Sequence, residues 1–258
     1  MTIGVSLASY LPWTAVNAMS VARGARQAGY TFIQVLPFRS VTVHLRHMLE
    51  PRYVEEAWNP AYTHRGADPK TPILLHDRLF FPSRQRCTEL FTAFRRLGAR
   101  WITHDLTDFH TTRDALLEVH PGLWLTPEEI ARQCGAPRLV LDLYHLRRPP
   151  RTDELAHRPQ RISAERSLLG DWRAALPVLL PLTRVIHVSP HRRDPTECTC
   201  FLEGRATEFE AMLIRCRGEF AGDYVVEVKM PLARSWGLPA LCDMLRQFHR
   251  RLAAVTGR

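Results

Sequence analysis

The chain has 258 residues, of which 45 % are hydrophobic and 24 % charged, so it can bury a full core, which argues against wholesale disorder. Its formal net charge of +9 suits polyanionic partners such as nucleic acid, or a phosphorylated small substrate. No apolar run approaches the roughly 20 residues of a membrane span, the six cysteines are too scattered for a disulfide framework, and the N-terminus lacks a basic leader, so we expect a cytoplasmic protein.

Short apolar segments recur along the chain, and each has the length of a buried strand. These predicted strands cover residues 3–8, 32–36, 72–76, 100–104, 115–119, 138–143, 184–188 and 224–228. Helical patterns lie between most of them, at residues 14–28, 84–97, 126–133, 168–178, 206–217 and 238–255. The third of these helices has clear end signals: Thr126 suits the N-cap, Pro127 the first turn and Glu129 the third position, with Gly135 beyond the end.

Strands that alternate with helices predict a parallel sheet, and eight such units in a chain of this length predict a closed (β/α)₈ barrel. We therefore expect one α/β domain, a single TIM barrel over residues 1–258. The alternative is an open doubly wound sheet, but no glycine-rich phosphate loop follows the first strand. Two stretches, 39–71 and 146–167, are too long for simple connections and would begin at the C-terminal face of the barrel, where long loops are often functional.

Histidines and carboxylates stand at the carboxyl ends of the third to eighth predicted strands. In a barrel these ends converge on one face, where active sites form. Imidazoles and carboxylates gathered there suit a divalent metal. A lone strand-end histidine is more often a core or surface group, so the joint pattern carries this prediction. The residues are His76, His104, Glu118, Asp142, His145, His187 and Glu227.

Four of these segments resemble the xylose-isomerase-like TIM barrels, a superfamily of sugar and sugar-phosphate isomerases and epimerases that also includes the endonuclease IV type of abasic-site nuclease. ALLEVHPG (115–122) looks like the fifth-strand glutamate segment and LVLDLYH (139–145) like the Asp-x-x-His signature. VIHV (185–188) looks like the seventh-strand histidine segment, and VVEV (225–228) like the final glutamate segment. The resemblance implies a metal held by Glu118, Asp142, His187 and Glu227.

The resemblance implies further site residues as well. His145 matches a histidine that contacts substrate in the epimerases and metal in the nucleases, whereas His76 and His104 match further metal ligands of the nucleases. Arg193 matches a substrate-binding arginine of the keto-sugar epimerases. The arginines that could hold a phosphate or hydroxyl groups of a substrate are Arg147, Arg148, Arg192 and Arg193.

The chain departs from the family pattern at two places. The second strand carries Gln34, followed by Arg39, where the sugar enzymes commonly have a glutamate. The nucleases carry an Asp-x-His pair beyond the seventh-strand histidine, whereas here that region reads HRRDPTECTCFLEG (191–204), with Cys198 and Cys200 near the expected place. Thiolates can ligate zinc, but a flexible loop with reduced cysteines is the favoured interpretation.

Two functions from different reaction classes follow, and the first is favoured because the Asp-x-His pair is missing. In the first, a sugar or sugar-phosphate isomerase or epimerase, Glu118 and Glu227 exchange a proton next to a carbonyl with the help of Mn, Mg, Co or Zn. The alternative is an endonuclease IV-like metal-dependent phosphodiesterase on abasic or damaged nucleic acid. The basic charge and the aromatic segment RLFFPSRQR (78–86) favour it. A barrel that serves only as a binding module is a third possibility.

Overall fold

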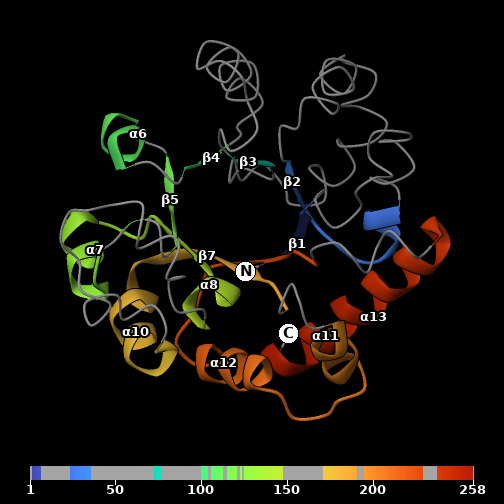
Figure 1. Ribbon diagram of the computed structural model, residues 1–258. Helices are drawn as coiled ribbons and strands as arrows, with labels where there is room; N and C mark the ends of the chain where they lie inside the picture. Colours follow the sequence, from blue (N-terminus) through green and yellow to red (C-terminus); the bar gives the residue numbers. More distant parts are fainter. Residues whose placement is uncertain are drawn as a thin grey trace, which may run out of the picture.

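Eight parallel strands close into a barrel in sequential order from β1 to β8 (Figure 1). A computed structural model of the chain describes residues 2–6, 24–35, 73–76, 100–103, 106–112, 115–120, 123, 125–147, 171–190, 195–228 and 237–257. The strands are β1 (Ile3–Ser6), β2 (Ile33–Val35), β3 (Ile73–His76), β4 (Arg100–Thr103), β5 (Leu116–Val119), β6 (Leu139–Asp142), β7 (Thr183–Val188) and β8 (Asp223–Val226). The closed ring confirms the predicted TIM barrel and excludes the open sheet.

The barrel closes because β1 pairs with strands from both ends of the chain. Val5 is the register partner of Ile33 in β2 and of Val226 in β8, and both pairings are parallel. Every predicted strand segment contains an observed strand, except that β7 and β8 each begin one residue before the predicted segment. The strand positions were therefore readable from the short apolar runs alone.

Helices cover the outside of the strands, and α7, α10, α12 and α13 lie around them in Figure 1. The described helices are α6 (Leu106–Thr111), α7 (Pro127–Gln133), α8 (Leu143–Arg147), α10 (Trp172–Leu179), α11 (Pro195–Leu202), α12 (Glu208–Cys216) and α13 (Leu238–Thr256), with a 3₁₀ helix, η6 (Leu180–Leu182). The expected helices at 126–133, 168–178, 206–217 and 238–255 match α7, α10, α12 and α13. Of the expected helix at 14–28, the described residues 24–27 are helical, and residues 14–23 lie outside the described part of the chain.

Three short helices, α6, α8 and α11, lie where the sequence predicted none. The predicted start of α7 is confirmed in detail: the Thr126 side chain accepts a hydrogen bond from the Glu129 backbone, and the Glu129 side chain accepts one from the Thr126 backbone. The described residues do not include the expected helix at 84–97, the stretch 39–71 or the aromatic segment 78–86. Of the long stretch expected at 146–167, the first two residues belong to α8 and the others are not described.

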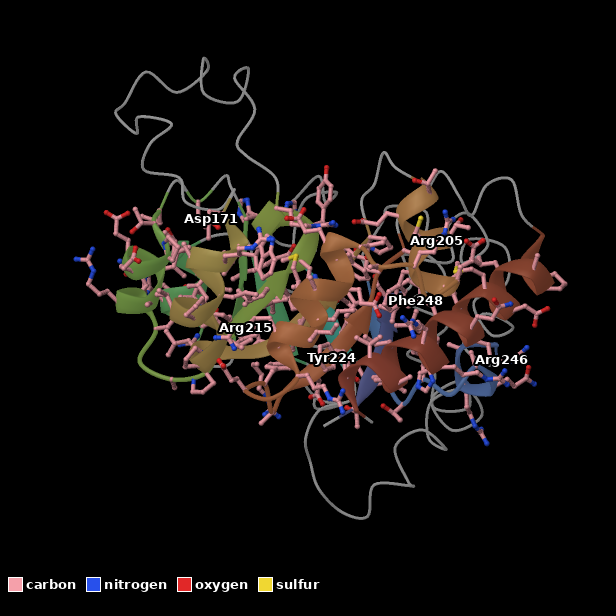
Figure 2. All side chains as sticks on the ribbon, turned by 90° about the horizontal axis from the view of Figure 1, so that it is seen from below. Asp171, Arg205, Arg215, Tyr224, Arg246 and Phe248 are labelled. Atoms are coloured by element: carbon pink, nitrogen blue, oxygen red, sulfur yellow. The ribbon has the colours of Figure 1, made fainter. Side chains whose placement is uncertain are left out.

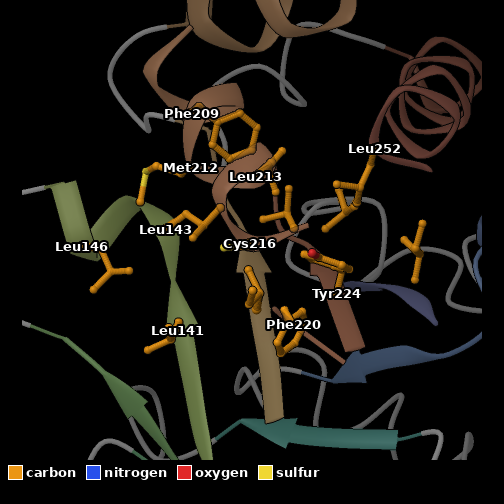
Figure 3. Close-up of a cluster of buried hydrophobic side chains, with 14 of the residues drawn as sticks. Leu141, Leu143, Leu146, Phe209, Met212, Leu213, Cys216, Phe220, Tyr224 and Leu252 are labelled. Atoms are coloured by element: carbon orange, nitrogen blue, oxygen red, sulfur yellow. The ribbon is translucent and has the colours of Figure 1, made fainter. Parts of the chain in front are cut away.

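Two apolar layers form on opposite faces of the strands, because side chains alternate across a strand. One layer fills the barrel interior with Phe32, Ile102, Leu116, Val140, Val185 and Val225. The other lies between strands and helices. Figure 3 shows part of this outer layer, in which Met212 and Leu213 of α12 belong to one cluster with Leu143 of α8 and Leu252 of α13.

A glycine gives Phe32 its place in the interior layer. A Cβ atom on Gly4 of β1 would lie 2.4 Å from Cε2 of the Phe32 ring, a distance that real atoms do not tolerate. The phenyl ring of Phe32, the residue before β2, thus occupies the space that a side chain at Gly4 would need. The Phe32 ring therefore packs directly against the backbone of β1.

Charged side chains lie on the outer surface of the helical layer. Of the residues labelled in Figure 2, Arg205 and Arg215 have exposed side chains, whereas Tyr224 and Phe248 are buried in the outer apolar layer. Among the helices that the structure describes, none has the length and apolarity to cross a membrane.

Candidate metal centre

Polar side chains form a layer directly above the apolar interior, at the carboxyl ends of the strands. Residues two positions apart on a strand point to the same face. The side chain two residues after each interior apolar residue therefore also faces the inside of the barrel. Leu116, Val140, Val185 and Val225 belong to the interior layer. The residues two places further along the chain are Glu118, Asp142, His187 and Glu227.

These four side chains converge. Asp142 and His187 are register partners across β6 and β7. Glu118, Asp142 and His187 each offer one ligand atom, and the three atoms lie within 4.8 Å of one another. Nδ1 of His187 lies 3.6 Å from Oε2 of Glu118 and 3.5 Å from Oε2 of Glu227, whose side chain follows β8. Two ligands about 2.0–2.2 Å from one ion are separated by about 3.0–3.5 Å, so these spacings are close to those around a single cation.

The electrostatics of the group also suit a cation. Glu118 is 1 % exposed, Asp142 0 % and Glu227 3 %, so three carboxyl groups are gathered away from water. An ionised carboxylate in such a place costs several kcal/mol unless its charge is balanced. Three carboxylates and one imidazole are a donor set that hard and borderline divalent cations accept. The residues present therefore fit the divalent metal that the sequence predicts.

The local backbone explains how Asp142 is oriented. β6 ends at Asp142, and α8 begins at the next residue. Oδ1 of Asp142 accepts a hydrogen bond of 2.8 Å from the backbone N–H of Tyr144, which satisfies a donor in the first turn of that helix. The other oxygen, Oδ2, is the one that lies 3.6 Å from His145. One oxygen is thus held by the backbone, while the second faces the polar group.

His145 lies at the edge of this group. Its Nε2 is 3.7 Å from Oε1 of Glu118 and 3.6 Å from Oδ2 of Asp142, and 14 % of its side chain is exposed. Its ring centroid is 6.3 Å from that of His120. A histidine that touches both carboxylates and water can reach a molecule bound above them.

Gln34 belongs to the same layer, although the sequence analysis gave it no role. Its Oε1 lies 2.7 Å from Nε2 of His187, and both side chains are fully buried. The signal that could have found it is the same two-residue step, because Gln34 follows the interior residue Phe32 at that spacing.

Several predicted residues are not brought into this group by the described structure. β3 ends at His76, but its side chain is not described. His104 and Arg193 lie outside the described residues, together with Arg148 and Arg192.

The structure places the guanidinium of Arg147 against another side chain, which argues against the expectation that it holds substrate. That group forms a two-pronged ion pair with Glu197, with Nη2 3.0 Å from Oε2, and only 8 % of the side chain is exposed. It also lies 5.6 Å above the Phe209 ring. These partners already occupy its charge.

The cysteines after β7 differ from the expectation of a flexible loop. Residues 195–202 form α11, and Cys198 is buried in the outer apolar layer. Burial raises the pKa of the Cys198 thiol to about 12. A zinc ligand must be a thiolate, so this environment argues against Cys198 as a ligand.

Comparison with known proteins identifies the fold. No protein-family model matches the chain, and no curated protein sequence matches it. The structure of D-psicose 3-epimerase from Clostridium cellulolyticum H10, solved with D-tagatose, is similar over 99 % of both chains, with 12 % sequence identity and a TM-score of 0.56. A D-allulose 3-epimerase from Methylomonas sp. matches over 98 % of both chains, with 14 % identity and a TM-score of 0.41. The first likeness confirms the TIM-barrel fold.

Proposed function

We propose that the chain is a divalent-cation-dependent sugar or sugar-phosphate isomerase or epimerase in which Glu118 and Glu227 move a proton next to a carbonyl. The observation that carries this proposal is that both glutamates meet at Nδ1 of His187, at the end of the barrel where active sites of this fold form. Proton transfer next to a carbonyl needs one group that accepts a proton and one that returns it. Two converging carboxyl groups from β5 and from the end of β8 supply that pair.

The residues that would hold the cation are Glu118, Asp142, His187 and Glu227. When bound, Mn, Mg, Co or Zn would supply positive charge opposite the oxygen on which negative charge develops. In our proposal, one glutamate takes the proton from the carbon beside the carbonyl while the other carries a proton on its carboxyl group. If the second glutamate gives its proton to the opposite face of the same carbon, the product is the epimer. If that proton goes instead to the former carbonyl carbon, and the hydroxyl proton moves from the neighbouring oxygen to the carbonyl oxygen, the product is the isomer. The two roles exchange in the reverse reaction.

His145 would bind the substrate rather than move the proton. Its ring borders both Glu118 and Asp142 and keeps some exposure, so it can hydrogen-bond a sugar hydroxyl group above them. Arg193, which the family resemblance matches to a substrate-binding arginine, would act beside it. Small sugars and sugar phosphates are the substrate class that this arrangement suits.

The nuclease alternative requires metal ligands beyond these four. Its candidates are His76 and His104, and neither has a described side chain. In the described segment after β7, Glu197 pairs with Arg147 and Cys198 lies in the apolar layer. Within 195–202, no observation favours a cluster of metals, so we do not propose the nuclease function.

The test is a panel of ketoses, with and without phosphate, offered to the purified protein in D₂O with Mn, Mg, Co or Zn added in turn. Abstraction of a proton next to the carbonyl incorporates deuterium at that carbon, which NMR detects. We expect Glu118→Gln and Glu227→Gln each to lower kcat by about 10²–10⁴-fold, whereas the exposed Glu128→Gln on α7 leaves it unchanged. Absence of turnover, together with metal-dependent incision of an abasic duplex that Glu118→Gln abolishes, would replace this proposal by the nuclease.

A further inference from the structure

The buried contact between Gln34 and His187 joins residues that are 153 positions apart in the chain. Strand pairing on both sides holds the backbone of Gln34, whose register partners are Ser6 of β1 and Leu74 of β3. His187 is held in the same way between Asp142 of β6 and Val225 of β8. The 2.7 Å separation of Oε1 and Nε2 is therefore a consequence of the barrel itself.

This contact determines which ring nitrogen of His187 carries the proton. In the orientation of the Gln34 amide in the structure, Oε1 faces the ring, and because an amide oxygen only accepts hydrogen bonds, Nε2 is the nitrogen that donates. In a neutral imidazole the other nitrogen, Nδ1, is then unprotonated. Nδ1 is the atom that faces Glu118 and Glu227 at 3.6 and 3.5 Å. A histidine can ligate a metal only through an unprotonated nitrogen, and a partner on its second nitrogen fixes that state.

We propose that Gln34 is a positioning residue of the candidate metal centre: its amide oxygen holds Nε2–H of His187 and so presents Nδ1 to the divalent cation. This inference rests on the proposed function, because it requires a cation at the centre. A glutamine also accepts the hydrogen bond without adding a fourth buried carboxylate to Glu118, Asp142 and Glu227.

The first measurement is Mn²⁺ affinity by calorimetry for four versions of the full chain. Gln34→Leu removes the acceptor at nearly constant size and should weaken Mn²⁺ binding by about 10–100-fold. Gln34→Glu keeps an acceptor oxygen and should bind Mn²⁺ at least as tightly as the wild type, while its fourth buried carboxylate should lower the stability of the metal-free protein. Thr183→Val is the control: it removes a buried hydrogen bond to the Leu179 carbonyl at the opposite end of β7, and should leave the affinity unchanged.

The second measurement is ¹⁵N NMR of the His187 ring in the Zn²⁺-loaded protein. We expect the ring proton to be on Nε2. This proton should exchange slowly with water in the wild type and quickly in Gln34→Leu. A proton on Nδ1, or a Gln34→Leu affinity equal to that of the wild type, would overturn the inference. If Gln34→Leu does not fold, Gln34→Met replaces it, because methionine is unbranched like glutamine and has only a weakly accepting sulfur in place of the amide oxygen.

The two proposals can fail separately. A wild type that binds Mn²⁺ but turns over no sugar contradicts the proposed function, while the affinities of the Gln34 variants still decide this inference. A wild type that binds no divalent cation contradicts both. If the wild type turns over a sugar and Gln34→Leu binds Mn²⁺ as tightly as the wild type, only this inference is contradicted.

Discussion

Asp142 shows how a single residue can serve both the fold and the candidate site. Its Oδ1 accepts the backbone N–H of Tyr144 at the start of α8, and its carboxyl group is fully buried beside His187 and Glu118. The start of α8 thus orients Oδ2 of Asp142 towards the candidate site in the absence of a ligand. A buried carboxylate at the end of an apolar strand has, in this protein, a structural partner on one oxygen and a proposed cation on the other.

Gly4 gives a prediction at the same scale. Gly4→Ala places a methyl group against the Phe32 ring inside the barrel, and overpacking of this kind costs about 1–3 kcal/mol of unfolding free energy. Urea denaturation of the wild type and the variant measures the difference. Gly135→Ala is the matched control, because its Cβ would meet nothing within 4 Å, and we expect a change below about 0.5 kcal/mol. Equal stabilities for Gly4→Ala and the control would contradict the close packing of β1 against Phe32.

At the scale of elements, α8 and α11 are joined by the ion pair between Arg147 and Glu197. The two helices follow β6 and β7, the strands that carry Asp142 and His187. Both side chains of the pair are nearly buried, at 8 % and 10 % exposure. A residue that the sequence offered as a substrate ligand therefore connects two helices that follow the strands of the candidate site.

Breaking this pair should be costly, because it leaves one buried charge without its partner. We expect Arg147→Met and Glu197→Gln each to lower the unfolding free energy by about 3 kcal/mol. Arg173→Met is the control: its contact with Glu208 is mostly exposed, and its loss should cost less than about 1 kcal/mol. Chemical denaturation of the three variants and of the Arg147/Glu197 double variant checks this. A double-variant effect equal to the sum of the single effects would show that the two side chains act independently.

For the whole molecule, the candidate ligands come from four consecutive parts of the barrel, β5 to β8. A cation bound by all four would therefore connect half of the ring, and its ligands would be brought together only in the folded state. Ligands that bind the folded state alone stabilise it by mass action, by about 2.7 kcal/mol at a concentration of 100 times Kd. This link between site and fold gives a prediction that does not depend on the substrate.

We expect saturating Mn²⁺ to raise the Tm by about 5–10 °C, since each kcal/mol shifts the Tm of a chain of this size by about 2–4 °C. Asp142→Asn keeps an oxygen for the Tyr144 N–H but removes one of three neighbouring buried charges. Without added metal its Tm should equal or exceed that of the wild type, while the shift caused by Mn²⁺ becomes much smaller. Differential scanning calorimetry measures both. An unchanged Mn²⁺ shift in Asp142→Asn would speak against Asp142 as a ligand.

The amino-acid sequence alone determined the barrel and the polar residues at its carboxyl end. Strand length, helix caps and the alternation of residues on a strand are local properties, so short apolar runs revealed β1 to β8 without any partner being known. The order of strands then brought Glu118, Asp142, His187 and Glu227 to one face, because a closed parallel barrel puts all strand ends together.

Only the tertiary structure decided which of the polar residues touch, because those contacts join distant parts of the chain. Gln34 read as a missing glutamate until barrel closure placed it against His187. The sequence offered Arg147 as a group that could hold substrate, whereas the fold pairs it with Glu197 of α11. Cys198 is disfavoured as a metal ligand because α11 places its side chain in the outer apolar layer. The sequence gives the charge of each side chain, but the partner that balances this charge depends on how distant parts of the chain pack together.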